Sequence, residues 1–101
     1  MSESQILAIE EIREVIIQVA PRYPIKTVRL FGSYADGNAK KDSDIDLMIE
    51  SKGVFTLLHL CGFENDVSEK LKKHVDILHY QENDMTELDF NKVIKLYEKN
   101  S

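Results

Sequence analysis

The stretch LFGSYADGNAKKDSDIDLMIE, residues 30–50, carries most of the information about the fold. It joins two apolar segments through a loop rich in glycine, lysine and aspartate. Asp42, Asp44 and Asp46 occupy alternate positions and lead directly into an apolar run. Alternation along a strand places Asp44 and Asp46 on one face, with Cα atoms about 6.6 Å apart. We therefore predict a buried strand over residues 44–50 that presents two carboxylates at its start.

The rest of the chain divides by hydrophobic periodicity and by the positions of glycine and proline. The predicted elements are a helix over 2–20 with a capping box at Ser2 and Gln5, a strand over 25–31, a turn and short helix over 32–38, the strand over 44–50, a helix over 54–73 with a kink or break at Gly62, a strand over 74–80 and an amphipathic helix over 83–100. The connection between the first two strands is too short for a crossover helix, which predicts a mixed sheet. The order predicts an α/β (α+β) fold, a small mixed sheet with flanking helices in two or three layers.

Length and composition limit the classes of protein that fit. A chain of 101 residues is predicted to form one domain, residues 1–101, and a domain this small makes a homo-oligomer or a partner subunit plausible. The net charge of −5 argues against a general nucleic-acid binder. The single cysteine, Cys61, excludes an intramolecular disulfide, and charges interrupt the apolar positions of residues 6–20, which excludes a membrane span there. We expect a cytoplasmic protein.

The loop before the acidic strand is typical of an anion site. Gly32 and Ser33 stand where a strand turns into a helix start, so backbone N–H groups and the Ser33 hydroxyl are available to a phosphate. Asp44 and Asp46 on the neighbouring strand are suited to hold hard divalent cations. A third acid, Asp76 in KKHVDILHY, has apolar neighbours, which is a costly place for a charge without a partner. Together these residues predict a site for a metal-bound nucleoside triphosphate.

The pattern of Gly32-Ser33, ten residues, and Asp44-Ile45-Asp46 resembles the signature of the DNA polymerase β-like nucleotidyltransferase superfamily. Small size and the later Val75-Asp76-Ile77 are similar to the minimal nucleotidyltransferase (MNT) family. The resemblance implies a nucleotidyltransferase fold, two Mg²⁺ ions and ATP as nucleotide donor. It implies that Gly32 and Ser33 hold the triphosphate, that Asp44 and Asp46 bind both metals, and that Asp76 completes one metal site and assists deprotonation of the acceptor hydroxyl.

The resemblance also implies a partner. Many minimal members are antitoxins of HEPN ribonuclease toxins, which they neutralise by transferring AMP to a tyrosine or by binding. We therefore expect an Mg²⁺-dependent transfer of AMP to a hydroxyl of a partner protein. Neutralisation by occlusion, with weak or no catalysis, stays open because Asp36 stands where relatives frequently carry a basic residue. Transfer to a small molecule is less favoured, since no second domain supplies a pocket.

Other interpretations of the same residues carry less weight. An EF-hand that begins at Asp42 fails, because Leu47 and Gly53 stand where that loop needs glycine and glutamate. Solvated acids at a strand end are an ordinary alternative for Asp44 and Asp46. The histidines His74 and His79 are five residues apart and so face opposite sides of a strand, which makes them a poor metal pair.

Overall fold

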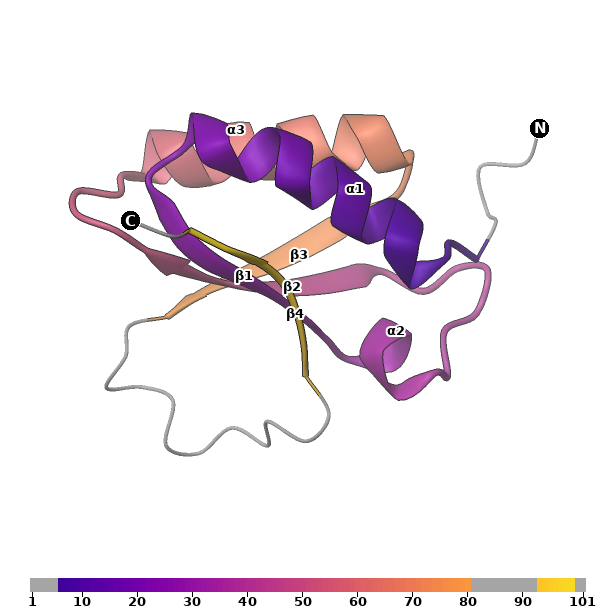
Figure 1. Cartoon of the computed structure of the whole chain (residues 1–101). Helices are drawn as coiled ribbons and strands as arrows, with labels where there is room; N and C mark the ends of the chain where they lie inside the picture. The colour runs from indigo at the N-terminus through magenta and orange to yellow at the C-terminus, as the bar shows by residue number, and fades with distance from the viewer. Residues whose placement is uncertain (1–5, 81–92, 100–101) are drawn as a thin grey trace.

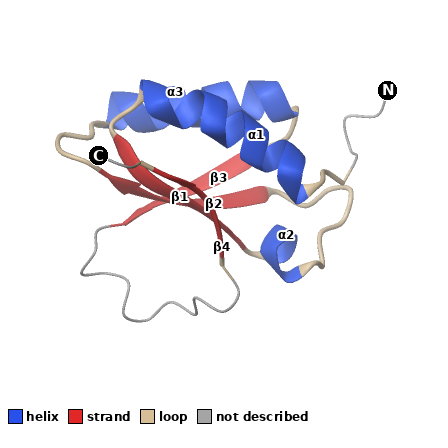
Figure 2. Ribbon diagram, viewed as in Figure 1, coloured by secondary structure: helices blue, strands red, loops and turns tan. Residues whose placement is uncertain are grey.

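The computed structural model describes residues 6–80 and 93–99. The elements, in chain order, are α1 (Ile9–Val19), the 3₁₀ helix η1 (Ala20–Arg22), β1 (Ile25–Phe31), α2 (Ser33–Asp36), β2 (Ile45–Ser51), α3 (Leu57–Leu71), β3 (Val75–Tyr80) and β4 (Ile94–Glu98). Figure 1 shows α1 and α3 side by side on one face of a single sheet, and Figure 2 shows the same division into a helical and a strand layer. The domain thus has two layers. No helix in the described ranges is long and apolar enough to cross a membrane.

The sheet is mixed, as predicted. Its strand order is β3-β2-β1-β4; β2 and β4 pair antiparallel with β1, and β3 pairs parallel with β2. The connection between β1 and β2 is short, so β2 runs antiparallel to β1. The connection from β2 to β3 contains the 15-residue helix α3, which allows β3 to run parallel to β2. This order puts the two strands with aspartates side by side.

The core lies between the helices and the sheet. Its members are apolar residues of α1, β1, β2, α3 and β3, fully or almost fully buried: Ile12, Ile16, Val19, Val28, Leu30, Ile45, Leu47, Ile49, Phe63, Val67 and Val75. The residues of β1 and β2 in this set alternate along each strand, so each strand turns its other side chains to the open face of the sheet. Asp46 and Asp76, which pair in register, lie on that open face.

The end of the chain differs from the prediction. The predicted helix over 83–100 is wrong at its end, because residues 94–98 form strand β4. Its part up to residue 92, with the cap at Asp84 and Glu87, lies outside the described residues. Apolar positions at 93, 94 and 97 fit a helical period, but the second edge of β1 offers a continuous row of backbone donors and acceptors. Pairing of Val28 with Tyr97 and of Leu30 with Ile94 satisfies that row and buries Leu96.

The first and third helices also differ in detail. Helix α1 begins at Ile9, where the Glu11 side chain accepts a hydrogen bond from the Ala8 N–H at 3.1 Å, and the predicted cap at Ser2 and Gln5 lies outside the described residues. Helix α3 continues through Gly62 without a break. A Cβ atom at Gly62 would lie 3.0 Å from the Tyr23 hydroxyl oxygen, so glycine is there to let a ring approach the helix.

Tyr23 ties the connection after α1 to α3. Its hydroxyl donates to Asp66 Oδ2 at 2.5 Å, and its ring packs edge-on against Phe63. The hydrogen bond to Asp66, and to a smaller extent the burial of the hydroxyl, raises the pKa of Tyr23 from 10.0 to about 12. The tyrosine therefore stabilises the fold while it is protonated.

We expect Tyr23→Phe to lower the free energy of unfolding at pH 7 by about 1–2 kcal/mol, because it removes a hydrogen bond to a charged acceptor. Tyr34→Phe is the matched control, since the Tyr34 hydroxyl accepts only a long hydrogen bond of 3.4 Å from the Leu7 N–H. The contribution of Tyr23 is complete below pH 10.0 and is lost as the pH rises towards about 12. Urea titrations across this range measure both effects; equal losses in the two variants would contradict the assignment.

Candidate active site

Three aspartates meet at one end of the open face of the sheet. Asp44 directly precedes β2, Asp46 lies within it, and Asp76 lies in β3. Parallel pairing puts Asp46 opposite Asp76, and the Ile45 N–H donates to the His74 carbonyl at 3.1 Å to close the end of the ladder. The predicted approach of Asp76 to the other two acids is therefore present in the structure.

The turn after β1 packs directly against one of these acids. Gly32 has φ 75° and ψ −152°, and a Cβ atom there would lie 2.2 Å from Asp46 Oδ2. No side chain fits between them, so glycine is required both by the backbone conformation and by the carboxylate. The glycine turn and the acidic strand thus form one structural unit, which is what the sequence pattern predicted.

Ser33 begins the short helix α2 beyond this turn, as predicted. The Gly32 carbonyl accepts from Ala35 N and Asp36 N at 3.1 and 3.0 Å, and Gly37 ends the helix in the left-handed conformation. Tyr34, 3% exposed, anchors α2 in the core. The half-buried Ser33 therefore stands on a fixed turn next to Gly32 and Asp46.

Electrostatic repulsion is concentrated at Asp46. Burial, together with the negative charges of Asp76 and Asp44, raises the pKa of the Asp46 carboxyl, whereas His74 lowers it. Like charges brought together in this way favour either a proton or a cation. The arrangement fits a divalent ion, because hard cations prefer carboxylate oxygens.

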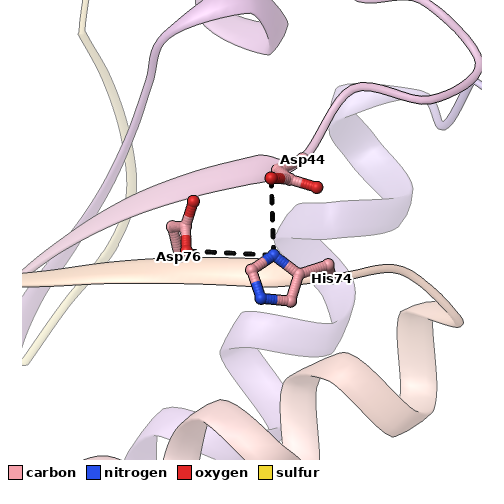
Figure 3. A group of neighbouring side chains, drawn as sticks. All are labelled: Asp44, His74 and Asp76. Atoms are coloured by element: carbon pink, nitrogen blue, oxygen red, sulfur yellow. Dashed lines mark ion pairs between the residues drawn. The ribbon is translucent and has the colours of Figure 1, made fainter.

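The structure adds one residue that the sequence analysis set aside. His74 Nδ1 lies 3.4 Å from Asp44 Oδ2 and 3.8 Å from Asp76 Oδ1 (Figure 3). Asp44, His74 and Asp76 each offer a ligand atom within 4.8 Å of the others. The spacing of two residues between His74, directly before β3, and Asp76 within it indicates that both side chains point to the same side of the sheet.

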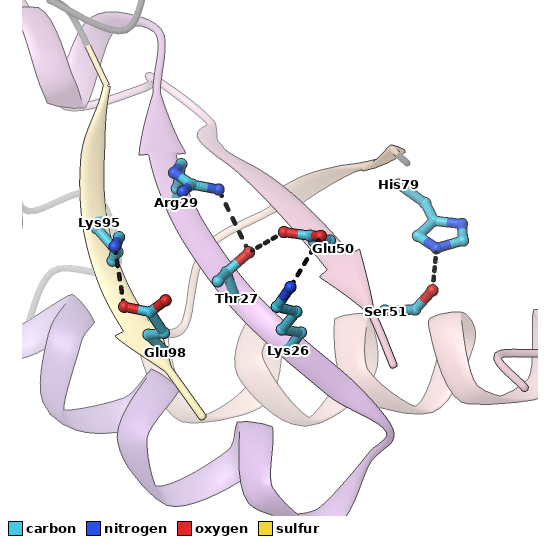
Figure 4. A network of polar contacts seen from close by, with 8 residues as sticks. All are labelled: Lys26, Thr27, Arg29, Glu50, Ser51, His79, Lys95 and Glu98. Carbon is cyan, nitrogen blue, oxygen red and sulfur yellow. Dashed lines mark hydrogen bonds and ion pairs between the residues drawn. The ribbon is translucent and has the colours of Figure 1, made fainter. Parts of the chain in front are cut away.

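The other end of the open face carries a separate polar network (Figure 4). The buried Thr27 donates its hydroxyl to Glu50 Oε1 at 3.2 Å and accepts from Arg29 Nη1 at 3.3 Å. The contact of His79 Nε2 with the Ser51 hydroxyl oxygen, 2.9 Å, is on the other side of the sheet, because His79 pairs in register with the buried Ile49. Glu50 is four residues beyond Asp46, or about 13 Å along the strand. The Thr27–Glu50 network is therefore separate from the acidic site, and His79 lies on the opposite side of the sheet from the carboxylates that His74 contacts.

A family model described as "Polymerase beta, Nucleotidyltransferase" matches residues 14–101. A protein of Methanocaldococcus jannaschii named "Putative protein adenylyltransferase MJ0435" is 38% identical over 72 residues, which cover 71% of this chain and 77% of that protein.

Two solved structures are similar in fold. One is described as "Structure of putative minimal nucleotidyltransferase" and has a TM-score of 0.61 and 34% identity. The match covers 66% of this chain and 68% of that chain. The other is a chain from a structure of a tri-AMPylated Shewanella oneidensis HEPN toxin in complex with an MNT antitoxin. It has a TM-score of 0.64 and 15% identity, and the match covers 89% of this chain and 72% of that chain. The second likeness concerns the fold alone.

Proposed function

Because the chain belongs to the polymerase β nucleotidyltransferase family, we propose that it transfers AMP from ATP, with Mg²⁺, to a hydroxyl of a partner protein. The M. jannaschii relative, named as an adenylyltransferase of proteins, supports this choice of nucleotide and acceptor. The observation that carries the proposal is the direct packing of the Gly32 turn against Asp46, with Asp76 opposite in the sheet. It combines a phosphate-binding turn and metal-binding carboxylates at one point.

The chain's own residues take distinct parts in this reaction. The backbone at Gly32 and the hydroxyl of Ser33 hold the triphosphate. Asp44 and Asp46 would hold the Mg²⁺ ions, and Asp76 would be a further ligand. Mg²⁺, when bound, supplies charge neutralisation at the triphosphate and polarises the α-phosphate.

Proton transfer completes the proposed step. Asp76 is exposed on the open face, where an acceptor hydroxyl can reach it, and it assists removal of the hydroxyl proton. The acceptor oxygen then forms a bond to the α-phosphorus, and the bond between that phosphorus and the pyrophosphate oxygen breaks. Pyrophosphate leaves with the electron pair of the broken bond.

We propose a HEPN-type toxin as the partner and one of its tyrosines as the acceptor. The Shewanella structure that shares the fold contains a HEPN toxin carrying AMP together with an MNT antitoxin, which supports this pairing. An exposed site also suits a protein acceptor, since Asp44 and Asp76 are 49% and 58% exposed. A folded segment of a partner can approach them without opening a cavity.

The test uses ATP labelled either on the α- or on the γ-phosphate, with Mg²⁺ and a purified HEPN-type toxin as candidate acceptor. We expect the α-label, and not the γ-label, to become attached to the partner, and chelation by EDTA to abolish attachment. Mass spectrometry then identifies the modified side chain. Attachment of the γ-label would indicate phosphate transfer and would contradict the proposal.

Neutralisation by occlusion is the second candidate function. Three large apolar side chains lie in the open at the start of α3 and in the loop before it: Val54, Leu57 and Leu58 are 78%, 73% and 84% exposed. Exposed apolar groups of this kind are typical of a protein-binding surface. They lie at the opposite end of β2 from Asp44, so binding there does not depend on transfer chemistry.

A further inference from the structure

His74 is held at the carboxylate site by the backbone of the sheet. Its carbonyl accepts from Ile45 N at 3.1 Å, and the preceding turn is fixed by the Ser68 hydroxyl, which donates to the Lys73 carbonyl at 2.8 Å. The imidazole leans over the paired strand ends, with Nδ1 facing both Asp44 and Asp76 (Figure 3). It therefore belongs to the same ligand set as these two acids.

The donor atoms are spaced for one small cation. With zinc bonds of about 2.0–2.2 Å, neighbouring ligand atoms of one ion lie about 3–3.6 Å apart. The Nδ1 atom lies 3.4 Å from Asp44 Oδ2 and 3.8 Å from Asp76 Oδ1, and all three donors lie within 4.8 Å. Small side-chain rotations bring exposed groups from these separations to coordination distance.

The chemistry of the donors selects the ion. Mg²⁺ prefers oxygen ligands in a regular octahedron. Zn²⁺ accepts imidazole nitrogen and carboxylate oxygen in the same site, often as three protein ligands with a fourth position left open. We propose that Asp44, His74 and Asp76 form a mixed nitrogen–oxygen site that binds Zn²⁺ more tightly than Mg²⁺. This deepens the proposed function, since it rests on the same carboxylates and names a second ion that competes for them.

The experiment measures metal binding without any transfer reaction, so it can fail separately from the proposed function. Tag-free protein at pH 7.5 is titrated with Zn²⁺ or Mg²⁺ by calorimetry, as wild type, His74→Ala and His79→Ala. We expect His74→Ala to weaken Zn²⁺ binding at least about 10-fold and to change Mg²⁺ binding less than about threefold. His79→Ala is the matched control, because His79 is also exposed but lies within β3, away from the acids, and contacts Ser51 instead.

A direct spectroscopic measurement makes the outcome independent of how the variant folds. The chain has three histidines, so imidazole ¹⁵N resonances of the wild type are few and can be assigned with the two variants. We expect Zn²⁺, and not Mg²⁺, to shift the His74 Nδ1 resonance. An unshifted His74 resonance, equal Zn²⁺ affinity in His74→Ala and wild type, or an equal loss in His79→Ala would each overturn the proposal.

Discussion

Asp46→Asn should reduce AMP transfer by a factor on the order of 10³ while the protein stays folded. The substitution keeps the size of the side chain beside Gly32 but removes the negative charge that a metal ion needs. The rate of α-label attachment measures the loss, and circular dichroism confirms that the fold is kept. Because Asp46 lies at the centre of the three acids, this change has the largest expected effect on activity.

Asp42→Asn is the matched control for this prediction. Asp42 is an exposed acid four residues earlier, in the loop before β2, and it is outside the group of ligand atoms formed by Asp44, His74 and Asp76. We expect it to retain nearly full activity, because only the overall charge changes. If Asp46→Asn is as active as Asp42→Asn, the proposed catalytic site is wrong.

The same pair of variants separates transfer from occlusion. If neutralisation of the partner requires transfer, Asp46→Asn loses protection and Asp42→Asn keeps it. If occlusion is sufficient, Asp46→Asn still silences the partner although no label is attached. Growth of cells that express the toxin with each variant distinguishes the two outcomes.

Asp46→Asn should also raise the thermal midpoint of the metal-free protein at neutral pH. The pKa of Asp46 is raised by burial and by its acidic neighbours, so the ionised group destabilises the fold above its folded pKa. The neutral amide carries no such penalty. As the pH falls towards 3.8, protonation of Asp46 should therefore increase the stability of the wild type. The variant has no carboxyl at this position and lacks that increase.

Gly32→Ala is expected to destabilise the protein by about 1–3 kcal/mol and to reduce transfer at least about 100-fold. Two effects combine: the backbone at φ 75° and ψ −152° is one that only glycine adopts readily, and the new Cβ atom would stand 2.2 Å from Asp46 Oδ2. The carboxylate must rotate away, which takes it from its place beside the turn. Denaturant titration and the labelled-ATP assay measure the two effects.

Gly37→Ala separates backbone strain from displacement of the carboxylate. Gly37 also has a positive φ, 80°, but an added Cβ atom meets nothing within 4 Å. We expect a loss of about 1–2 kcal/mol in stability and almost unchanged transfer. Equal loss of activity in the two variants would show that Gly32 acts only through the strain of the loop.

Local sequence was sufficient for the elements next to the site. The strand over residues 25–31 has the predicted bounds, the short helix is closed by Gly37 as predicted, and the acidic strand begins one residue later than predicted. These features depend on side-chain alternation and on the conformational freedom of glycine, which neighbouring residues determine. Residues 94–98 could not be assigned in this way, because β4 exists through its pairing with a distant strand.

The sequence by itself determined which residues carry charge, which strand presents Asp44 and Asp46, and where the chain turns between them and Gly32. Only the tertiary structure decided that β3 lies parallel to β2, in the register that sets Asp76 opposite Asp46 and brings His74 to Asp44. Periodicity specifies the face of a strand but not its neighbour. The neighbour is chosen when α3 packs on the sheet and returns the chain, a contact between residues far apart in the sequence.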